Sequence, residues 1–320
     1  MAIVSRRKIY ALALIACGVS FALALRLGAV SNLTWNEIVQ LRLPRAVLAG
    51  AVGMGLAVAG AALQALFANP LCEPYTLGIS SGAALGSVIG ISLGSWGLVW
   101  GLAPPAFLGA LVFAGVLYFF ALRPSFGNVS LLLMGVLLGF FGTSLVTVWL
   151  ALSDTNGLQS VMSWLWGDFS RARIHGAVLA LVLNLGLTFL IILRWRELDA
   201  LLTGEEGAAS LGIDVPAARR GLILLTSLLI GVCVSGAGMI GFVGLLVPHW
   251  CRRWVGSLHL ALLPLAAIVG ATVMIVADMV ARVVARPNEL PVGVVTALIG
   301  VPAFWLILFK RNLPMQEQVR

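Results

Sequence analysis

Long apolar runs, divided by short stretches rich in glycine, proline and charged residues, are the feature that most limits what this chain can form. An α-helix needs about 20 residues to cross a hydrocarbon layer about 30 Å thick, and several runs reach that length. No run alternates apolar and polar residues as a membrane-spanning strand does. Only 10% of the residues are charged, against about 25% in a soluble domain. The sequence therefore predicts an all-α integral membrane protein.

The apolar runs give nine clear candidate spans and a shorter tenth one. The nine lie near residues 9–30, 46–67, 77–99, 103–122, 130–151, 174–194, 219–236, 261–284 and 292–309. The tenth candidate, "MIGFVGLLVPHW" at 239–250, covers only about 18 Å as a helix. It is therefore either a re-entrant segment or a short complete span.

Basic residues decide between nine and ten spans, because they are enriched on the cytoplasmic side of membrane proteins. With ten spans and a cytoplasmic N-terminus, thirteen of the lysines and arginines lie inside and seven lie outside. With nine spans, the basic residues from Arg252 onward change sides without a matching gain. We therefore expect about ten transmembrane helices in one bundle, a single domain over residues 1–320, with both termini in the cytoplasm.

Several other classes of protein are disfavoured by the same sequence. The net charge of +8 comes from basic clusters at the ends of apolar runs, so it indicates topology rather than a nucleic-acid partner. The four cysteines are scattered without CxxC spacing, which predicts neither disulfides nor a metal site. Neither Lys8 nor Lys310 follows the glycines of a phosphate-binding loop. We expect no catalytic residues and no ATPase site in this chain.

The stretch "NPLCEPYTLG" at 69–78 interrupts two apolar runs with two prolines. Proline lacks an amide donor and disfavours helix in the residue before it, so Pro70 and Pro74 end one span and redirect the next. We expect a tight cytoplasmic connection between the second and third spans here.

Glycine then recurs at every fourth residue of the following span. One face of that helix carries Gly78, Gly82, Gly86, Gly90 and Gly94. Such a stripe lets another backbone approach closely, which is how helices pack in lipid. We expect this helix to be buried among its neighbours.

One long, charged connection is expected on the cytoplasmic side, at residues 194–220. Within it, Glu205 to Leu211 has the composition of a short helix that Gly212 would end in a C-cap role. Ala208, Ala209 and Leu211 would share an apolar face. That face either packs on the chain's own bundle or contacts a partner.

Two outer features have alternative interpretations. The segment 153–175 carries Trp164, Trp166 and Phe169 among polar residues, and it is either an interfacial anchor or a lid over a pathway. Asp278 lies within a span, and Arg282 follows one helical turn later. The two side chains form either a structural ion pair or part of a proton-carrying site.

Several segments together resemble the FecCD-type permeases, the membrane subunits of ABC importers for iron-siderophore complexes, haem and cobalamin. The chain contains, in matching order, "LRLPR", "ALQALFANPLCEPYTLGISSGAALG", "TGEEGAASLG", "GMIGFVGLLVPHWCRRWVG", "ADMVAR" and "ELPVGVVTALIGVPAF". The resemblance runs from about residue 35 to 310. Because independent segments match in order, the likeness is specific.

The resemblance implies an assembly. Permeases of this type have ten helices and pair as homodimers or pseudo-dimers around a central pathway in the cytoplasmic (inner) membrane of bacteria or archaea. They bind two cytoplasmic ATPase subunits, which use ATP and Mg, and they receive substrate from an extracytoplasmic binding protein. This chain itself would bind membrane lipid but no cofactor. Among the two pairing modes, we expect a homodimer here.

The resemblance also implies roles for individual residues. The segment at about 195–219 would couple to the ATPase, through Gly204, Glu205, Glu206, Ala208, Leu211 and Gly212. Exposed guanidinium groups would dock carboxylates of the binding protein, from Arg42, Arg45 and Arg282. The docking role of Arg282 competes with its pairing to Asp278.

In the family, the fifth helix and its two ends line and close the pathway. Where some relatives carry a Ser/Thr pair at the inner gate, this chain has Asn128 and Val129. The candidate pathway and gate residues are Asn128, Ser130, Met134, Thr143, Ser144, Thr147 and Trp164. Helix packing is the alternative role for each of the lining residues.

The expected function is ATP-driven import of a metal chelate by alternating access, with a ferric siderophore as the first candidate. Cobalamin and haem are alternatives within the same family. An ion-coupled secondary transporter is the alternative from a different class, and it would rest on Asp278.

Overall fold

The computed structural model describes residues 6–28, 34–93, 103–123, 126–153, 161–162, 164–286 and 288–312. Within these ranges every regular element is a helix. The helices are α1 (Arg6–Arg26), α2 (Trp35–Glu37), the π-helix η1 (Ile38–Arg42), α3 (Leu43–Leu66), the 3-10 helix η2 (Pro74–Leu77), α4 (Ile79–Ser92), α5 (Pro104–Ala121), α6 (Asn128–Leu152), α8 (Ile174–Leu193), α9 (Trp195–Leu201), α10 (Glu205–Ser210), α11 (Val215–Ala237), α12 (Val243–Val255), α13 (His259–Val283) and α14 (Val292–Asn312).

The predicted apolar runs coincide with helices. Seven helical segments are long and apolar enough to cross a membrane, by length and composition: α1, the continuous segment from α2 to α3, α5, α6, α8, α11 and α13. Shorter apolar helices occur at Ile79–Gly90 and Val292–Leu306. The short run at 239–250 yields α12, which has 13 residues. The fold class predicted from the sequence, an all-helical membrane bundle, is thus what the described residues form.

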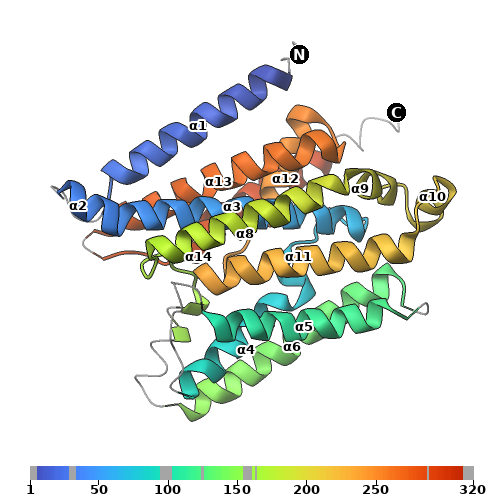
Figure 1. The fold of residues 1–320 in the computed structure, drawn as a ribbon, viewed down its shortest axis with the longest axis horizontal. Coiled ribbons are helices and arrows are strands. Elements are labelled where there is room, and N and C mark those ends of the chain that lie inside the picture. Colours follow the sequence, from blue (N-terminus) through green and yellow to red (C-terminus); the bar gives the residue numbers. More distant parts are fainter. Residues whose placement is uncertain are drawn as a thin grey trace.

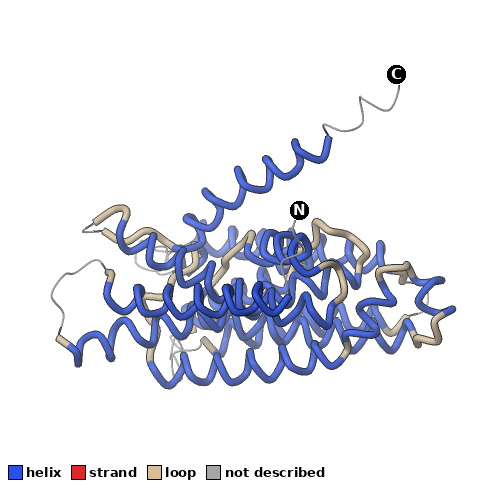
Figure 2. The backbone as a smooth tube through the Cα atoms, turned by 90° about the horizontal axis from the view of Figure 1, so that it is seen from above, coloured by secondary structure: helices blue, strands red, loops and turns tan. Residues whose placement is uncertain are grey.

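The helices lie roughly side by side along the long axis of the molecule (Figure 1). α3 is central and packs against α13, α8, α11 and α12. α1 covers α13 on one side, while α4 and α5 pack on α11 at the other, with α6 beyond them. α2 and α10 mark opposite ends of the bundle, and the last helix projects from its body (Figure 2).

α3 can occupy the centre because its sequence is dominated by alanine and glycine. A Cβ added at Gly53 would lie 2.2 Å from the Gly270 carbonyl oxygen of α13, and one added at Gly60 would lie 2.0 Å from the Gly244 carbonyl oxygen of α12. Contacts this short require backbone against backbone. Close packing of this kind holds helices together in lipid, where burial of apolar surface gives no drive.

The glycine stripe of α4 makes the close helix contact predicted from its spacing. A Cβ at Gly86 would lie 2.0 Å from the Pro105 carbonyl oxygen, and one at Gly82 would lie 2.6 Å from the Gly109 carbonyl oxygen. Both partners belong to α5. Gly94 lies outside the described residues.

Gly109→Ala is expected to destabilise the protein by about 1–3 kcal/mol, since its Cβ would lie 2.1 Å from the Gly82 carbonyl oxygen and force the helices apart. Gly115 is on the same helix, with nothing within 4 Å of an added Cβ. Gly115→Ala should be neutral or gain up to about 1 kcal/mol from helix propensity. Thermal unfolding of the two variants in detergent, followed by size-exclusion chromatography, makes the comparison. Equal stabilities would contradict the packing role of the stripe.

Candidate functional site

Three connections between the long helices, each with irregular backbone, meet inside the bundle. They are the connection 67–78, the outer segment 164–173 and the segment 238–242 between α11 and α12. The 13 residues of α12 extend about 20 Å, which is less than a hydrocarbon layer of about 30 Å. As a complete span, α12 would need part of the segment before it to lie at membrane depth. Irregular backbone is tolerated there only when it is buried in protein or lines a cavity.

Glu73 of the connection 67–78 accepts a hydrogen bond from the backbone at the start of α12. The Phe242 N–H donates to a carboxylate oxygen of Glu73, Oε2, at 3.2 Å. Gln64 of α3 donates through Nε2 to the carbonyl oxygens of Cys72 at 3.3 Å and Gly244 at 3.2 Å. Glu73 lies in the connection between two helices, where it is shielded from water. Burial raises the pKa of its carboxyl, and the hydrogen bond from the Phe242 N–H partly offsets that rise. These contacts fasten the two irregular segments to α3.

The outer segment is tied to α11 and to the start of α14 through its backbone. The Asp168 N–H donates to the Ala237 carbonyl oxygen at 2.9 Å, and the Gly293 N–H donates to the Trp166 carbonyl oxygen at 3.1 Å. Gly167 has a φ of 73°, in the left-handed region that favours glycine. Its backbone turn brings the segment against both helices and supplies the hydrogen bonds that buried backbone requires.

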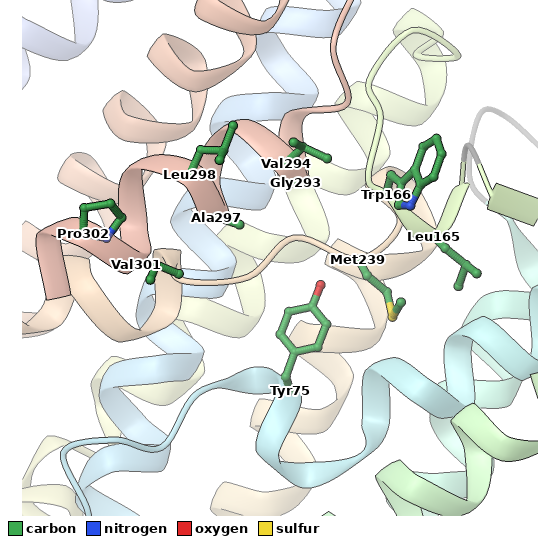
Figure 3. A pocket seen from close by; sticks show the side chains of 10 residues that line it. All are labelled: Tyr75, Leu165, Trp166, Met239, Gly293, Val294, Ala297, Leu298, Val301 and Pro302. Atoms are coloured by element: carbon green, nitrogen blue, oxygen red, sulfur yellow. The ribbon is translucent and has the colours of Figure 1, made fainter. Parts of the chain in front are cut away.

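An open, apolar cavity of about 610 Å³ lies where these segments meet. Figure 3 shows Tyr75 of η2, Met239 and Trp166 on one side and the first turns of α14 on the other. The lining residues are Tyr75, Leu165, Trp166, Met239, Gly293, Val294, Ala297, Leu298, Val301 and Pro302. The Tyr75 hydroxyl and the Trp166 indole are the polar groups of this otherwise smooth surface. A wall of this kind can accommodate a large ligand without binding it tightly at one point.

The connection "NPLCEPYTLG" is only partly exposed. Residues such as Leu71 are exposed, but Pro74 and Leu77 are buried. A Cβ at Gly78 would lie 2.6 Å from the Gly135 carbonyl oxygen, about two turns into α6. The connection therefore does not stay at the surface of the bundle. It folds back into the bundle, because its prolines prevent helix while its apolar side chains still favour burial, and it brings Tyr75 to the cavity.

The two tryptophans of the segment 164–173 lie in different surroundings. Trp164, the candidate pathway residue, is buried in the core at 8% exposure. A Cβ at Gly238 would lie 2.1 Å from its carbonyl oxygen, so the residue packs against the end of α11. Trp166 is 52% exposed and lines the cavity. Sequence spacing alone did not distinguish these two rings.

The predicted pathway helix corresponds to α6, which is held to the bundle along one side. Its buried residues are Leu131, Gly135, Gly142 and Val146. The remaining candidates lie on its other faces: Met134 and Asn128 are partly buried, and Ser130, Thr143, Ser144 and Thr147 are exposed. The Thr147 hydroxyl donates to the Thr143 carbonyl oxygen at 2.8 Å. Hydroxyl groups satisfied within the helix leave a largely apolar exterior.

A buried cluster of charged groups lies where the start of α3 meets the end of α13. Asp278 is 1% exposed. Arg282 Nε lies 3.0 Å from Asp278 Oδ2, as the spacing of the two residues predicts. Arg45 Nε lies 2.7 Å from Asp278 Oδ1, and Arg45 Nη1 lies 2.7 Å from Glu289 Oε2. The carboxylate of Asp278 is thus shared by two guanidinium groups, the second of which the sequence pattern did not reveal.

The expectation of exposed docking arginines is wrong for this protomer. Arg42, Arg45 and Arg282 are 7%, 7% and 3% exposed. Arg42 Nη1 donates to the Arg26 carbonyl oxygen at 2.6 Å, and Arg282 Nη1 donates to the Leu27 carbonyl oxygen at 3.1 Å. The physical reason is that the last carbonyls of α1 need donors, and these guanidinium groups supply them. Arg45 also contacts the carboxylate of Glu289, an exposed residue.

The coupling segment forms the short helix predicted from the sequence. α10 runs from Glu205 to Ser210, and Gly212 follows with a φ of 81°. The Ile213 N–H donates to the Ala208 carbonyl oxygen at 3.1 Å, so Gly212 provides the predicted C-cap. Ala208 is fully buried on its own bundle, whereas Leu211 is 64% exposed. The predicted apolar face is therefore divided between internal packing and solvent.

Within the described ranges, no three His, Cys, Asp or Glu side chains come together as metal ligands would. The four cysteines are free, and Cys72, Cys233 and Cys251 are buried.

Known proteins are similar to this chain in sequence, and a solved structure is similar to it in fold. A cobalamin import system permease, BtuC of Halobacterium salinarum, is 41% identical over 278 residues, which cover 85% of this chain and 73% of that protein. A hemin transport system permease, HmuU of Yersinia pestis, is 39% identical over 284 residues, or 87% of this chain and 85% of that protein. A solved structure described as an inward-facing ABC transporter of the metal-chelate type superposes with a TM-score of 0.87 at 31% identity, covering 95% and 99% of the two chains. The model of the FecCD transport family matches residues 8–310, so this chain belongs to that family.

Proposed function

We propose that this chain is the transmembrane subunit of an ATP-binding-cassette importer and moves a metal chelate inward by alternating access. The observation that carries the proposal is the apolar cavity formed where three irregular connections meet, in a chain of the FecCD transport family. Irregular backbone at membrane depth marks substrate sites in transporters. The smooth apolar wall suits a bulky cargo selected elsewhere, by a separate binding protein.

The proposed topology has ten transmembrane helices: the seven long segments together with α4, α12 and α14. Both termini are cytoplasmic, and residues 1–320 form one permease domain in the cytoplasmic (inner) membrane of a bacterium or archaeon. In Figure 1, α1 begins nearer the end that carries α10 than the end that carries α2, in keeping with this topology. The basic residues, thirteen inside and seven outside, support the same assignment.

A second copy of the chain completes the pathway in this proposal. α6 and α14 expose many large apolar side chains, among them Leu137, Phe140, Leu298 and Trp305. The cavity is open, and residues of α14 line part of it. A homodimer would enclose it between two equivalent walls, and membrane lipid would cover the rest.

Two cytoplasmic ATPase subunits bind the coupling segment at about 195–219 in this proposal, with contacts at Gly204, Glu205, Glu206, Leu211 and Gly212. Leu211 is an exposed apolar side chain on a polar connection, which fits an interface anchor. Ala208 supports that surface from beneath. ATP and Mg belong to the ATPase, and the permease binds no cofactor itself.

The outer end receives the binding protein in this proposal. Arg45 is paired with the carboxylate of Glu289, an exposed residue, so docking in this proposal acts on the Arg45–Glu289 pair rather than on a free guanidinium group. Arg42 and Arg282 hold the end of α1 beneath that surface.

Uptake by proteoliposomes tests the function. Vesicles would hold this chain with its ATPase and binding protein, and labelled ferric siderophore, haem and cobalamin would be offered outside. ATP-dependent accumulation of one chelate is expected. The relatives named above carry cobalamin and hemin, and the ferric siderophore expected from the sequence stays a prediction. Uptake that ignored ATP and followed a proton gradient would instead support an ion-coupled transporter.

A further inference from the structure

One buried arginine joins the coupling segment to the entrance of α6. Arg219 lies in the first turns of α11. Its Nη2 donates to Glu205 Oε1 at 2.5 Å, and its Nη1 donates to the Phe126 carbonyl oxygen at 2.9 Å. Glu205 is the first residue of α10, and Phe126 lies just before α6. A single guanidinium therefore holds two segments that are distant in the sequence.

The same carboxylate also contacts α6 directly. The backbone N–H of Asn128, the first residue of α6, donates to Glu205 Oε1 at 3.3 Å. The first N–H groups of a helix have no partner within the helix, and a negative charge is favourable beside them. Glu205 thus caps α6 from another part of the chain, so α10 and the entrance of α6 share one set of hydrogen bonds.

The contact joins a buried guanidinium group to a carboxylate that is partly open to water. The Arg219 side chain is 8% exposed, and the Glu205 side chain is 44% exposed. Bonds between a guanidinium and a carboxylate are stronger than neutral hydrogen bonds, and the planar fork fixes their directions. A partner seated on α10 would cover Glu205 further and reduce its exposure to water. The link would then become more rigid as the partner binds.

The connection has a second attachment, on a different helix. Asp199 of α9 accepts a hydrogen bond from the His259 N–H at 2.8 Å, and its Oδ1 lies 2.6 Å from His259 Nδ1. His259 is the first residue of α13, which packs against α3 at the centre of the bundle. The base of the coupling segment is therefore fixed to the central helices, whereas its far end is fixed to α6.

We propose that Arg219 is a positioning residue that couples displacement of α10 to the cytoplasmic entrance of α6, through Glu205, Phe126 and Asn128. The inference rests on the proposed function of this chain as an importer permease. When the ATPase shifts α10, the shared hydrogen bonds carry the residues before α6 with it. Without them, α10 would move while the entrance stayed in place, and ATP would be hydrolysed without transport.

The test is the ratio of chelate taken up to ATP hydrolysed, in proteoliposomes that hold the complete importer. Haem, cobalamin and a ferric siderophore serve as probes, and the chelate that the unaltered importer accumulates is used throughout. Arg219→Gln is expected to lower the ratio at least tenfold, because it removes the charge-assisted hydrogen bonds that join Glu205 and Phe126. ATP hydrolysis itself should persist.

Arg220→Gln is the matched control, because Arg220 is the neighbouring residue and is only half-buried. It should keep the ratio of the unaltered importer. Arg219→Lys keeps the charge but lacks the fork that binds two acceptors, and it should give an intermediate ratio. Glu205→Gln alters an exposed side chain and tests the same link if Arg219→Gln fails to fold. Its ratio should fall several-fold.

Equal ratios for Glu205→Gln, Arg219→Gln and Arg220→Gln would overturn the inference, and so would uptake and hydrolysis that fall together in a folded Arg219→Gln complex. Failure of the unaltered importer to accumulate any probe with ATP would instead reject the proposed function. The two failures are thus distinguishable.

Discussion

Asp278→Asn is expected to remove most of the folded protein from the membrane, with a loss of about 3–5 kcal/mol in the free energy of unfolding. The carboxylate lies 2.7 Å from Arg45 and 3.0 Å from Arg282, and all three side chains are buried. The amide leaves two guanidinium groups sharing an enclosed space with no full negative charge between them. Yield of monodisperse protein in detergent and its thermal unfolding temperature measure the effect.

Glu289→Gln is the control, because its side chain contacts the same arginine but is 34% exposed. Its loss should cost no more than about 1 kcal/mol, as for other ion pairs open to water. A variant that removes both charges, Arg282→Met with Asp278→Asn, leaves Arg45 with Glu289 as its counterion and should recover part of the lost stability. If Asp278→Asn were stable but abolished proton-driven uptake, Asp278 would carry protons and the ion-coupled alternative would be correct.

Leu211→Ala is expected to weaken binding of the ATPase subunit by about thirtyfold, which corresponds to about 2 kcal/mol for an interface anchor. The side chain is 64% exposed on the coupling segment, so its removal should leave the stability of the permease unchanged. Titration of the purified ATPase onto the permease in nanodiscs, followed by biolayer interferometry, measures the affinity.

The control for this prediction is Leu258→Ala. Leu258 is 55% exposed and precedes α13, outside the coupling segment. Its loss should leave the affinity within about twofold of the original value. Equal losses for the two leucines would mean that general apolar character, rather than the coupling segment, attracts the ATPase.

The parts of the fold that were predictable are those fixed by local pattern. Apolar runs of sufficient length become helices because lipid leaves no other partner for backbone groups. Glycine at every fourth residue places a bare face on α4, and that face meets α5. Gly212 ends α10 because it adopts the left-handed conformation without strain. In each case the cause lies within a few residues of the effect.

The parts that were not predictable depend on groups far apart in the sequence. Arg45 reaches Asp278 across 233 positions, so the i, i+4 spacing of Asp278 and Arg282 revealed only half of the cluster. The start of α12 is satisfied by Glu73 across 169 positions. Likewise, only the chain's path in space decides that Trp166 faces the cavity while Trp164 packs in the core.

The contact between η2 and α6 has a consequence for how the protein can change shape. At Gly78 and Gly135, two backbones touch with no side chain between them. Interlocked side chains must change rotamer before two elements can move past each other, whereas bare backbones present smooth surfaces with no rotamers to reset. At this contact, α6 can therefore shift against η2 without any side chain changing its rotamer. Its tilt can change while the hydrogen bonds and packing of the central helices stay intact.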